Sequence, residues 1–79
     1  RAMSSIRTQQ LRLVVYPNDH PPPHVHVLGP GWEVRVELSH PPVLMTVRGK
    51  VKTHEIGAAL LAVAEHLGQL RQLWSNLHD

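Results

Sequence analysis

The chain has 79 residues, a formal charge of +2 and no cysteine. This length supports one modest hydrophobic core, so we expect a single domain of at most two layers. The lack of cysteine excludes disulfides, zinc–thiolate sites and thiol chemistry. The mild positive charge permits contact with nucleic acid without favouring it. With one tyrosine and no phenylalanine, a platform for stacking single-stranded bases is not expected.

Nothing in the sequence indicates a membrane protein. No apolar run approaches the roughly 20 residues that cross a bilayer, and residues 1–10 lack the apolar centre of a signal peptide. We therefore expect a cytoplasmic protein. The predicted organisation is one domain over residues 1–79, in which residues 1–8 are disordered or added by cloning, residues 9–52 are rich in β-strand and residues 53–78 are helical.

Alternation of apolar and polar residues predicts β-strands at residues 11–16, 24–27 and 32–39, and the apolar segment at residues 43–47 is a further short strand. The third of these alternates over its whole length, so one of its faces is apolar and the other is polar. Between the first two strands lies a run of three prolines. Because proline cannot donate to a sheet ladder, we expect this segment to be extended and to lie outside the sheet.

From residue 53 the spacing of the apolar residues changes to that of an α-helix. They recur every three or four positions and form one stripe, made of Ile56, Leu60, Val63, Leu67, Leu70, Trp74 and Leu77. Thr53 is the expected N-cap, and Gly68 is a candidate for a bend. We predict an α+β fold, with an antiparallel sheet of three to four strands and one C-terminal amphipathic helix packed on one face.

The stretch NDHPPPHVHV, residues 18–27, holds three of the seven histidines. If the LGPG segment that follows forms the turn between two antiparallel strands, His26 lies opposite Glu33 and His24 opposite Arg35. The intervening valines then join the core, and both histidines point to the other face of the sheet. Neighbours across two strands at this spacing are close enough to interact.

This arrangement leaves three interpretations open. The first is a divalent metal site made of His20, His24, His26 and Glu33, with Asp19 as an alternative to His20, because imidazole and carboxylate groups form a recognised ligand set. The second is a metal-free phosphodiester site, in which His24 and His26 serve as base and acid beside a nearby cation. The third is the commonest one, in which the histidines are polar residues on the outer face of a strand and their pairs contribute little.

The same residues resemble the signature of a known family. The matching positions are Asp19, His20, Pro22, Pro23, His24 and His26, and the pattern Asp-His-x-Pro-Pro-His-x-His is that of small bacterial proteins grouped as domain of unknown function 4160. The resemblance runs from about Ile6 through the strand at residues 32–38 to the segment at residues 70–74. The chain departs from the family at residues 63–65, where relatives carry a tryptophan and acidic residues, and in a more apolar SHPPVLMTV segment.

The resemblance implies no established activity. Members of the family stand beside a second small protein in an arrangement similar to toxin–antitoxin pairs, which implies a small protein partner and an RNA or translation target. We accordingly expect a protein-interaction module of this kind, with the sheet face or edge around His24 and His26 as its contact surface. A homodimer is a further form that such a surface allows.

Two alternative functions remain. One is a metal-dependent or histidine-based nuclease or phosphodiesterase, with His24 and His26 as its centre and a divalent metal as its cofactor. The other is a nucleic-acid binder without chemistry. For contact with phosphates or a partner, the candidate cations are Arg35, Arg48, Lys50 and Lys52, the last three being on one side of an extended VRGKVK segment. The simpler explanation of those three is a charged edge that resists strand pairing.

Overall fold

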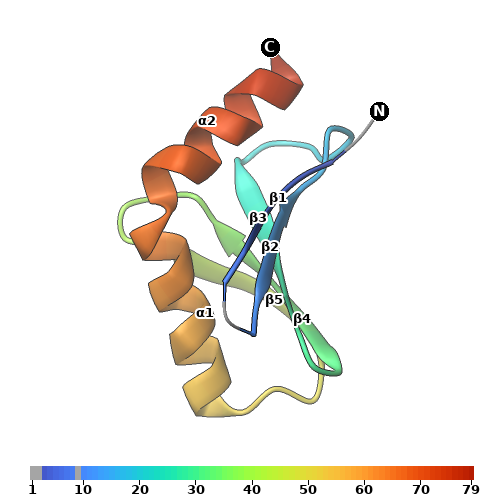
Figure 1. Cartoon of the computed structure of the whole chain (residues 1–79), viewed down its shortest axis with the longest axis vertical. Coiled ribbons are helices and arrows are strands. Elements are labelled where there is room, and N and C mark those ends of the chain that lie inside the picture. The colour runs from blue at the N-terminus through green and yellow to red at the C-terminus, as the bar shows by residue number, and fades with distance from the viewer. Residues whose placement is uncertain (1–2, 9) are drawn as a thin grey trace.

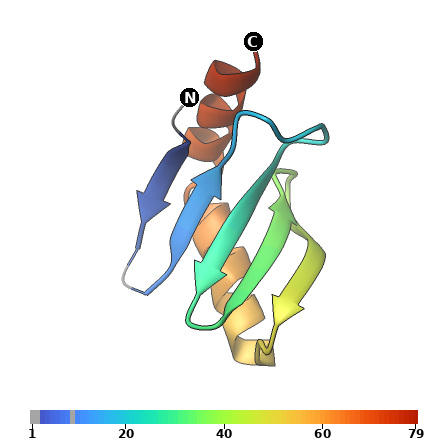
Figure 2. The same cartoon turned by 90° about the vertical axis from the view of Figure 1, so that its right-hand side faces the viewer.

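The computed structural model describes residues 3–8 and 10–79 and shows one antiparallel sheet with helices on one of its faces (Figure 1). The strands are β1 (Ser4–Arg7), β2 (Arg12–Val15), β3 (His24–Gly29), β4 (Trp32–Glu37) and β5 (Val43–Gly49). They lie in the sheet in chain order, each paired antiparallel with the next. The helices are α1 (Thr53–Glu65) and α2 (Leu67–His78). Figure 2 shows both behind the sheet, whose other face is uncovered.

The α+β class agrees with the prediction, but the predicted architecture of three to four strands and one C-terminal helix is wrong. The sheet has five strands, and two helices cover it. The additional strand is β1, within residues 1–8, where no strand was predicted. Its sequence SSIR contains one large apolar residue and so gives no alternation signal. β1 is an edge strand held by backbone pairing to β2, with Ile6 opposite Leu13.

The second correction concerns the helix, which is interrupted at His66. This residue has φ −114° and ψ 18°, outside the helical region. Its Nδ1 donates to the carbonyl of Ala62 at 2.9 Å, and a side chain that bonds the last carbonyls of a helix is one cause of such breaks. The apolar stripe keeps its period across the break, which is why one helix was predicted. Among the described residues, neither helix has the length and apolar character needed to cross a membrane.

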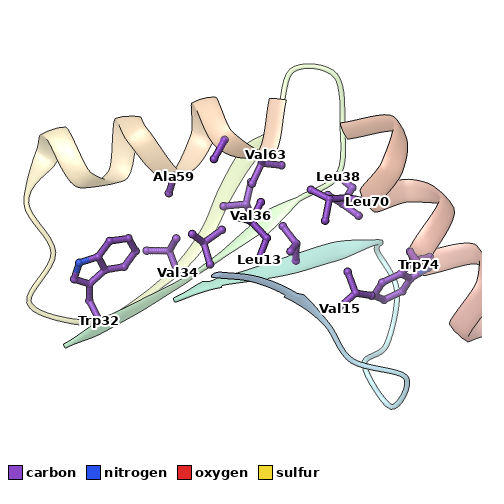
Figure 3. Close-up of a cluster of buried hydrophobic side chains, with 13 residues drawn as sticks. Leu13, Val15, Trp32, Val34, Val36, Leu38, Ala59, Val63, Leu70 and Trp74 are labelled. Atoms are coloured by element: carbon purple, nitrogen blue, oxygen red, sulfur yellow. The ribbon is translucent and has the colours of Figure 1, made fainter. Parts of the chain in front are cut away.

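The break changes the direction of the helix, so α1 packs over β4 and α2 over β2 (Figure 1). The core lies between these helices and the sheet (Figure 3). Trp32 and Trp74 stand at its two ends, and small residues such as Ala59 let α1 approach the strands closely. Its fully buried side chains from the strands are Leu13, Val15, Val25, Val27, Val34 and Val36, and those from the helices are Ala59, Val63 and Leu70. Each large one contributes about 1.5–3 kcal/mol through removal of apolar surface from water.

The turn between β3 and β4 is tighter than the predicted LGPG turn. Only a proline and a glycine form the loop, and Gly31 has φ +76°, a conformation that glycine adopts without strain. The register is therefore shifted by two residues from the predicted one, with His26 opposite Arg35 and His24 opposite Glu37. An even shift leaves the alternation of the strand in phase, so the valines of β3 still enter the core.

Candidate metal centre

The connection between β2 and β3, residues 16–23, carries the proline run and brings Asp19 next to β3. It lies outside the sheet pairing, as predicted, but it is bent rather than continuously extended, and the peptide bond between Pro21 and Pro22 is cis. At its end the carbonyl of Pro23 accepts a hydrogen bond from the backbone N–H of Leu38 at 2.9 Å. The loop is thereby fixed to the far end of β4.

Three metal-ligand atoms converge at this loop. Oδ2 of Asp19 lies 3.1 Å from Nε2 of His24 and 2.7 Å from Nε2 of His26. One ligand atom from each of the three residues lies within 4.8 Å of the others. Two ligands bound tetrahedrally to one zinc ion at 2.0–2.1 Å are about 3.3 Å apart. The two distances from Asp19 are therefore close to those between ligands of a single ion.

The other nitrogen of each imidazole ring is already engaged. Nδ1 of His24 donates to the carbonyl of Pro22 at 2.9 Å, and Nδ1 of His26 donates to Oε2 of Glu33 at 2.6 Å. Because a carbonyl and a carboxylate can only accept, both Nδ1 atoms carry hydrogen. In a neutral imidazole Nε2 then carries a lone pair. Two lone pairs and the carboxylate of Asp19 thus face one another, an arrangement that requires a cation, either a proton or a metal ion.

The surroundings of His24 favour a metal ion over a proton. Its side chain is buried, with 3% of the residue exposed, and its Nε2 has no hydrogen-bond partner among the described residues. The contact with Asp19 meets the distance of an ion pair but not the alignment of a hydrogen bond. A proton on Nε2 of His26 would satisfy Asp19 and leave His24 unpartnered, at a cost of about 1–3 kcal/mol. One metal ion would engage all three atoms.

Aromatic side chains enclose the two histidines. The ring of Trp74 lies 5.3 Å from that of His24, and the ring of Tyr16 meets that of His26 edge-on at 4.8 Å. His78 stacks on Trp74 at 3.7 Å and donates from Nε2 to the carbonyl of Asp19 at 2.8 Å. The last turn of α2 therefore braces the loop that supplies the carboxylate.

The structure rearranges the predicted ligand set. His24 and His26 come together as expected, although His24 is buried instead of lying on the open face. His20 is exposed and lies outside the cluster, whose third member is Asp19. Glu33 bonds the far side of the His26 ring, so its carboxylate lies outside the group formed by Asp19, His24 and His26.

Sequence reasoning missed the contribution of α2 to this site. Trp74 was assigned to the core alone, and His78 was given no role. Their spacing of four residues places them on one helix face and predicts their mutual contact. The bond from His78 to Asp19 joins residues 59 positions apart, and no local pattern indicates it.

The predicted cations do not form one group. Arg35 and Arg48 line a groove of about 340 Å³ on the open face of the sheet, and the other lining residues are His26, Glu33, Thr46 and Val47. Lys50 and Lys52 do not line it. The backbone N–H of Lys52 instead donates to Oε1 of Glu55 at 2.8 Å, at the start of α1. The N-cap is therefore Lys52 and not the predicted Thr53.

A larger groove of about 420 Å³ lies near the other end of the core, beside Trp32 and the first turns of α1. Among residues 3–8 and 10–79, the cluster suited to a metal ion is the one at Asp19, His24 and His26, away from this larger groove. Size alone does not make a site, so we place the candidate functional centre at the β2–β3 loop.

Comparison with known proteins identifies the family. A family model described as Domain of unknown function (DUF4160) matches residues 9–75. The matched span runs from before β2 to the last turns of α2 and includes the three clustered residues. Neither the curated proteins nor the solved structures gave a match. Since the model covers most of its length, the chain belongs to the DUF4160 family.

Proposed function

We propose that the protein binds a divalent transition-metal ion through Asp19, His24 and His26 and uses it for hydrolysis. The supporting observation is the convergence of the two Nε2 atoms on one carboxylate oxygen, with Nε2 of His24 buried and unpartnered among the described residues. Two imidazoles and a carboxylate are a ligand set that zinc and its first-row neighbours accept.

The groups behind the ligands also support a metal centre. In metal sites the second nitrogen of a ligating histidine is usually bonded to a carboxylate or a backbone carbonyl, which fixes the ring and its tautomer. Glu33 and the carbonyl of Pro22 occupy these two positions. The arrangement therefore resembles a prepared site more than a chance cluster of polar side chains.

The number of ligands favours catalysis over a purely structural role. Structural zinc sites have four protein ligands, whereas catalytic sites have three and leave a position for water or substrate. A metal ion held in this way supplies Lewis acidity for hydrolysis. The side chain of Asp19 is 26% exposed and that of His26 13%, so solvent and a small substrate can reach this side of the cluster.

Calorimetric titration with Zn²⁺, together with the visible spectrum of the Co²⁺ form, tests metal binding. We expect one ion per chain, and a loss of at least a hundredfold in affinity in His26→Ala and Asp19→Asn. His20→Ala is the matched control, because this histidine belongs to the same loop but is exposed and outside the cluster. Unchanged titrations in His26→Ala and Asp19→Asn would exclude the proposed centre.

The hydrolytic part is tested with chromogenic esters. Metal-loaded protein should cleave 4-nitrophenyl acetate or bis(4-nitrophenyl) phosphate faster than protein kept in EDTA, and His26→Ala should match the EDTA rate. Equal rates with and without metal would exclude the proposed hydrolytic activity and would be consistent with metal binding alone.

A second candidate function is the predicted protein-interaction module, and β5 supports it. β5 is an edge strand, and three of its apolar residues are exposed: Val43 (51%), Met45 (36%) and Val47 (47%). Exposed apolar edges are the sites where a strand of another chain adds to a sheet. In this proposal the partner is the second small protein of the toxin–antitoxin-like pair, which contributes a strand to β5.

Co-expression of the two small proteins tests this second candidate. Wild-type protein should co-purify with its partner in a fixed ratio, and Val43→Lys and Met45→Lys should each weaken the complex. Leu61→Lys serves as the control, because Leu61 is 61% exposed but lies on α1, away from the β5 edge. If all three variants co-purify equally well, β5 is not the contact. A homodimer formed without the partner would be detected by light scattering.

A further inference from the structure

The groove on the open face of the sheet borders the metal centre. Two rows of directly paired residues cross it. One row consists of His26, Arg35 and Thr46, and the other of Glu33 and Arg48. His26 is the shared element, since its Nε2 faces Asp19 and its ring also lines the groove. A ligand in the groove would therefore contact the ring of His26, whose Nε2 faces the proposed metal centre.

The two arginines supply the positive charge of this groove, and Glu33 is the one carboxylate among its lining residues. Nε of Arg35 donates to Oγ1 of Thr46 at 2.9 Å, and both residues line the groove. Throughout residues 3–8 and 10–79, no ion pair joins Arg35 or Arg48 to a carboxylate. The nearby carboxylate of Glu33 is engaged by His26 at 2.6 Å. The remaining N–H donors of both arginines are thus free to bind an anion.

The strands hold these donors on rigid elements. Arg35 lies in the middle of β4 and Arg48 near the end of β5, in adjacent rows of the sheet. The planar guanidinium group presents paired N–H donors that match the oxygens of phosphate, which a lysine cannot reproduce. The groove volume of about 340 Å³ is ample for a phosphate group and its ester substituents. Its volume and its two guanidinium groups therefore suit a phosphate better than an apolar or cationic ligand.

We infer that this groove binds a phosphate group of the substrate, which makes the substrate class a phosphodiester. The inference rests on the proposed metal centre, which would act on a phosphorus atom placed next to the groove. In the reaction, the oxygen of water forms a bond to phosphorus and the bond from phosphorus to one ester oxygen breaks. One proton of the water ends on the leaving oxygen and the other is retained on the phosphate monoester or released from it to solvent.

Binding of fluorescein-labelled single-stranded hexanucleotide RNA and of inorganic phosphate tests the groove separately from the metal. Both are measured in EDTA and again with Zn²⁺. We expect binding in EDTA, weakened about tenfold or more by Arg48→Ala or Arg35→Ala, because each variant removes a charge-assisted hydrogen bond. Lys50→Ala is the charge-matched control, since Lys50 does not line the groove. Loss of one phosphate contact should also lower the salt dependence of RNA binding by about one phosphate equivalent.

The outcomes separate the two proposals. If Arg35→Ala and Arg48→Ala bind phosphate and RNA as the wild type does, the groove inference fails while the Zn²⁺ titration still stands. If the Zn²⁺ titration is flat but both variants lose phosphate, the metal centre fails and the groove remains an anion site. Tighter binding of RNA than of phosphate would support a phosphodiester substrate, whereas equal binding would overturn this substrate class and leave a site for free phosphate. If Lys50→Ala loses as much affinity for phosphate and RNA as Arg48→Ala does, binding depends on general surface charge, and the groove inference is wrong.

Discussion

At the scale of single residues, the hydrogen-bond partners of the two His26 nitrogens determine which nitrogen is available to a metal ion. His26 is bonded on both sides, to Glu33 through Nδ1 and to Asp19 through Nε2, at 2.6 and 2.7 Å. The Glu33 bond fixes which nitrogen carries the hydrogen, and this choice directs a lone pair at Asp19. Glu33 therefore positions His26 without touching the ion that the cluster would hold.

Glu33→Gln tests this positioning role. We expect the affinity for Zn²⁺ to fall about 10- to 100-fold, the range found when partners behind metal ligands are removed, while the stoichiometry stays at one ion per chain. Titration calorimetry measures both quantities, and His26 ring shifts in NMR spectra report the change of tautomer. Glu37→Gln is the control, because it lies four residues after Glu33 on the same strand and forms no ion pair among the described residues. An equal loss of Zn²⁺ affinity in the two variants would mean that Glu33 acts only through its charge and does not position His26.

The sequence predicted this site only in part. Alternation in β3 was enough to identify His24 and His26 as neighbours of a β4 carboxylate, because the period of a strand is fixed. The choice of Asp19 over His20 depends on the bend of the proline loop, which alternation does not describe. The burial of His24 depends on Trp74, from a helix that no local pattern places there.

At the scale of elements, the sheet and the helices were predictable to different degrees. β4 was the clearest prediction because it alternates over its whole length, and its core face is buried as expected. β1 was missed because an edge strand held by backbone bonds needs no apolar pattern. The division of the helix at His66 was missed because the apolar stripe continues through it.

The helices contain two glycines at positions that have room for a larger side chain. A Cβ atom added at Gly57 or Gly68 would meet nothing within 4 Å. Gly57→Ala and Gly68→Ala should therefore each stabilise the fold by about 0.4–1 kcal/mol, through reduced entropy of the unfolded chain. Urea unfolding measures the change. Gly49→Ala should destabilise instead, because Gly49 has φ +83° and an added Cβ would lie 2.5 Å from the carbonyl oxygen of Gly31. A stabilised Gly49→Ala or a destabilised Gly57→Ala would contradict this prediction.

The start of α1 gives the fold a defined pH dependence. The pKa of Glu55 lies below its ordinary value of 4.5, first because its carboxylate accepts the backbone N–H of Lys52, and further because it accepts Nε1–H of Trp32. A lowered folded-state pKa stabilises the fold above pH 4.5, and this contribution is lost as the pH falls through the folded value.

Glu55→Gln should therefore lower the urea midpoint relative to wild type by a constant amount above pH 4.5, and this difference should shrink below it. Unfolding curves between neutral and strongly acidic pH measure the effect. Glu65→Gln, which removes the same charge at the end of α1, should not reproduce it. A difference between wild type and Glu55→Gln that is independent of pH would show that the carboxylate is not the cause.

At the scale of the whole molecule, metal binding and folding should be coupled. The cluster joins the β2–β3 loop to β3, and through Asp19 that loop is bonded to α2. A ligand that binds only the folded chain at a hundred times its dissociation constant stabilises it by about 2.7 kcal/mol. For a domain of this size that corresponds to a rise in Tm of about 10–20 °C.

Thermal unfolding followed by circular dichroism checks this prediction. Wild-type protein and His20→Ala should both show the rise with Zn²⁺ and lose it on addition of EDTA. His24→Ala should show no rise, even though its metal-free Tm differs from that of the wild type because a buried ring is removed. An equal rise in His24→Ala would mean that the ion binds elsewhere.

The bond between His78 and Asp19 also sets an order of events during synthesis. Asp19, His24 and His26 leave the ribosome well before His78, because the brace lies 59 positions after the residue that it holds. A nascent chain therefore carries these three residues before α2 can brace their loop, and the contact from His78 to Asp19 forms only once the last turn of α2 has emerged and docked. In terms of the proposed metal centre, full affinity for the ion should develop only after α2 has docked.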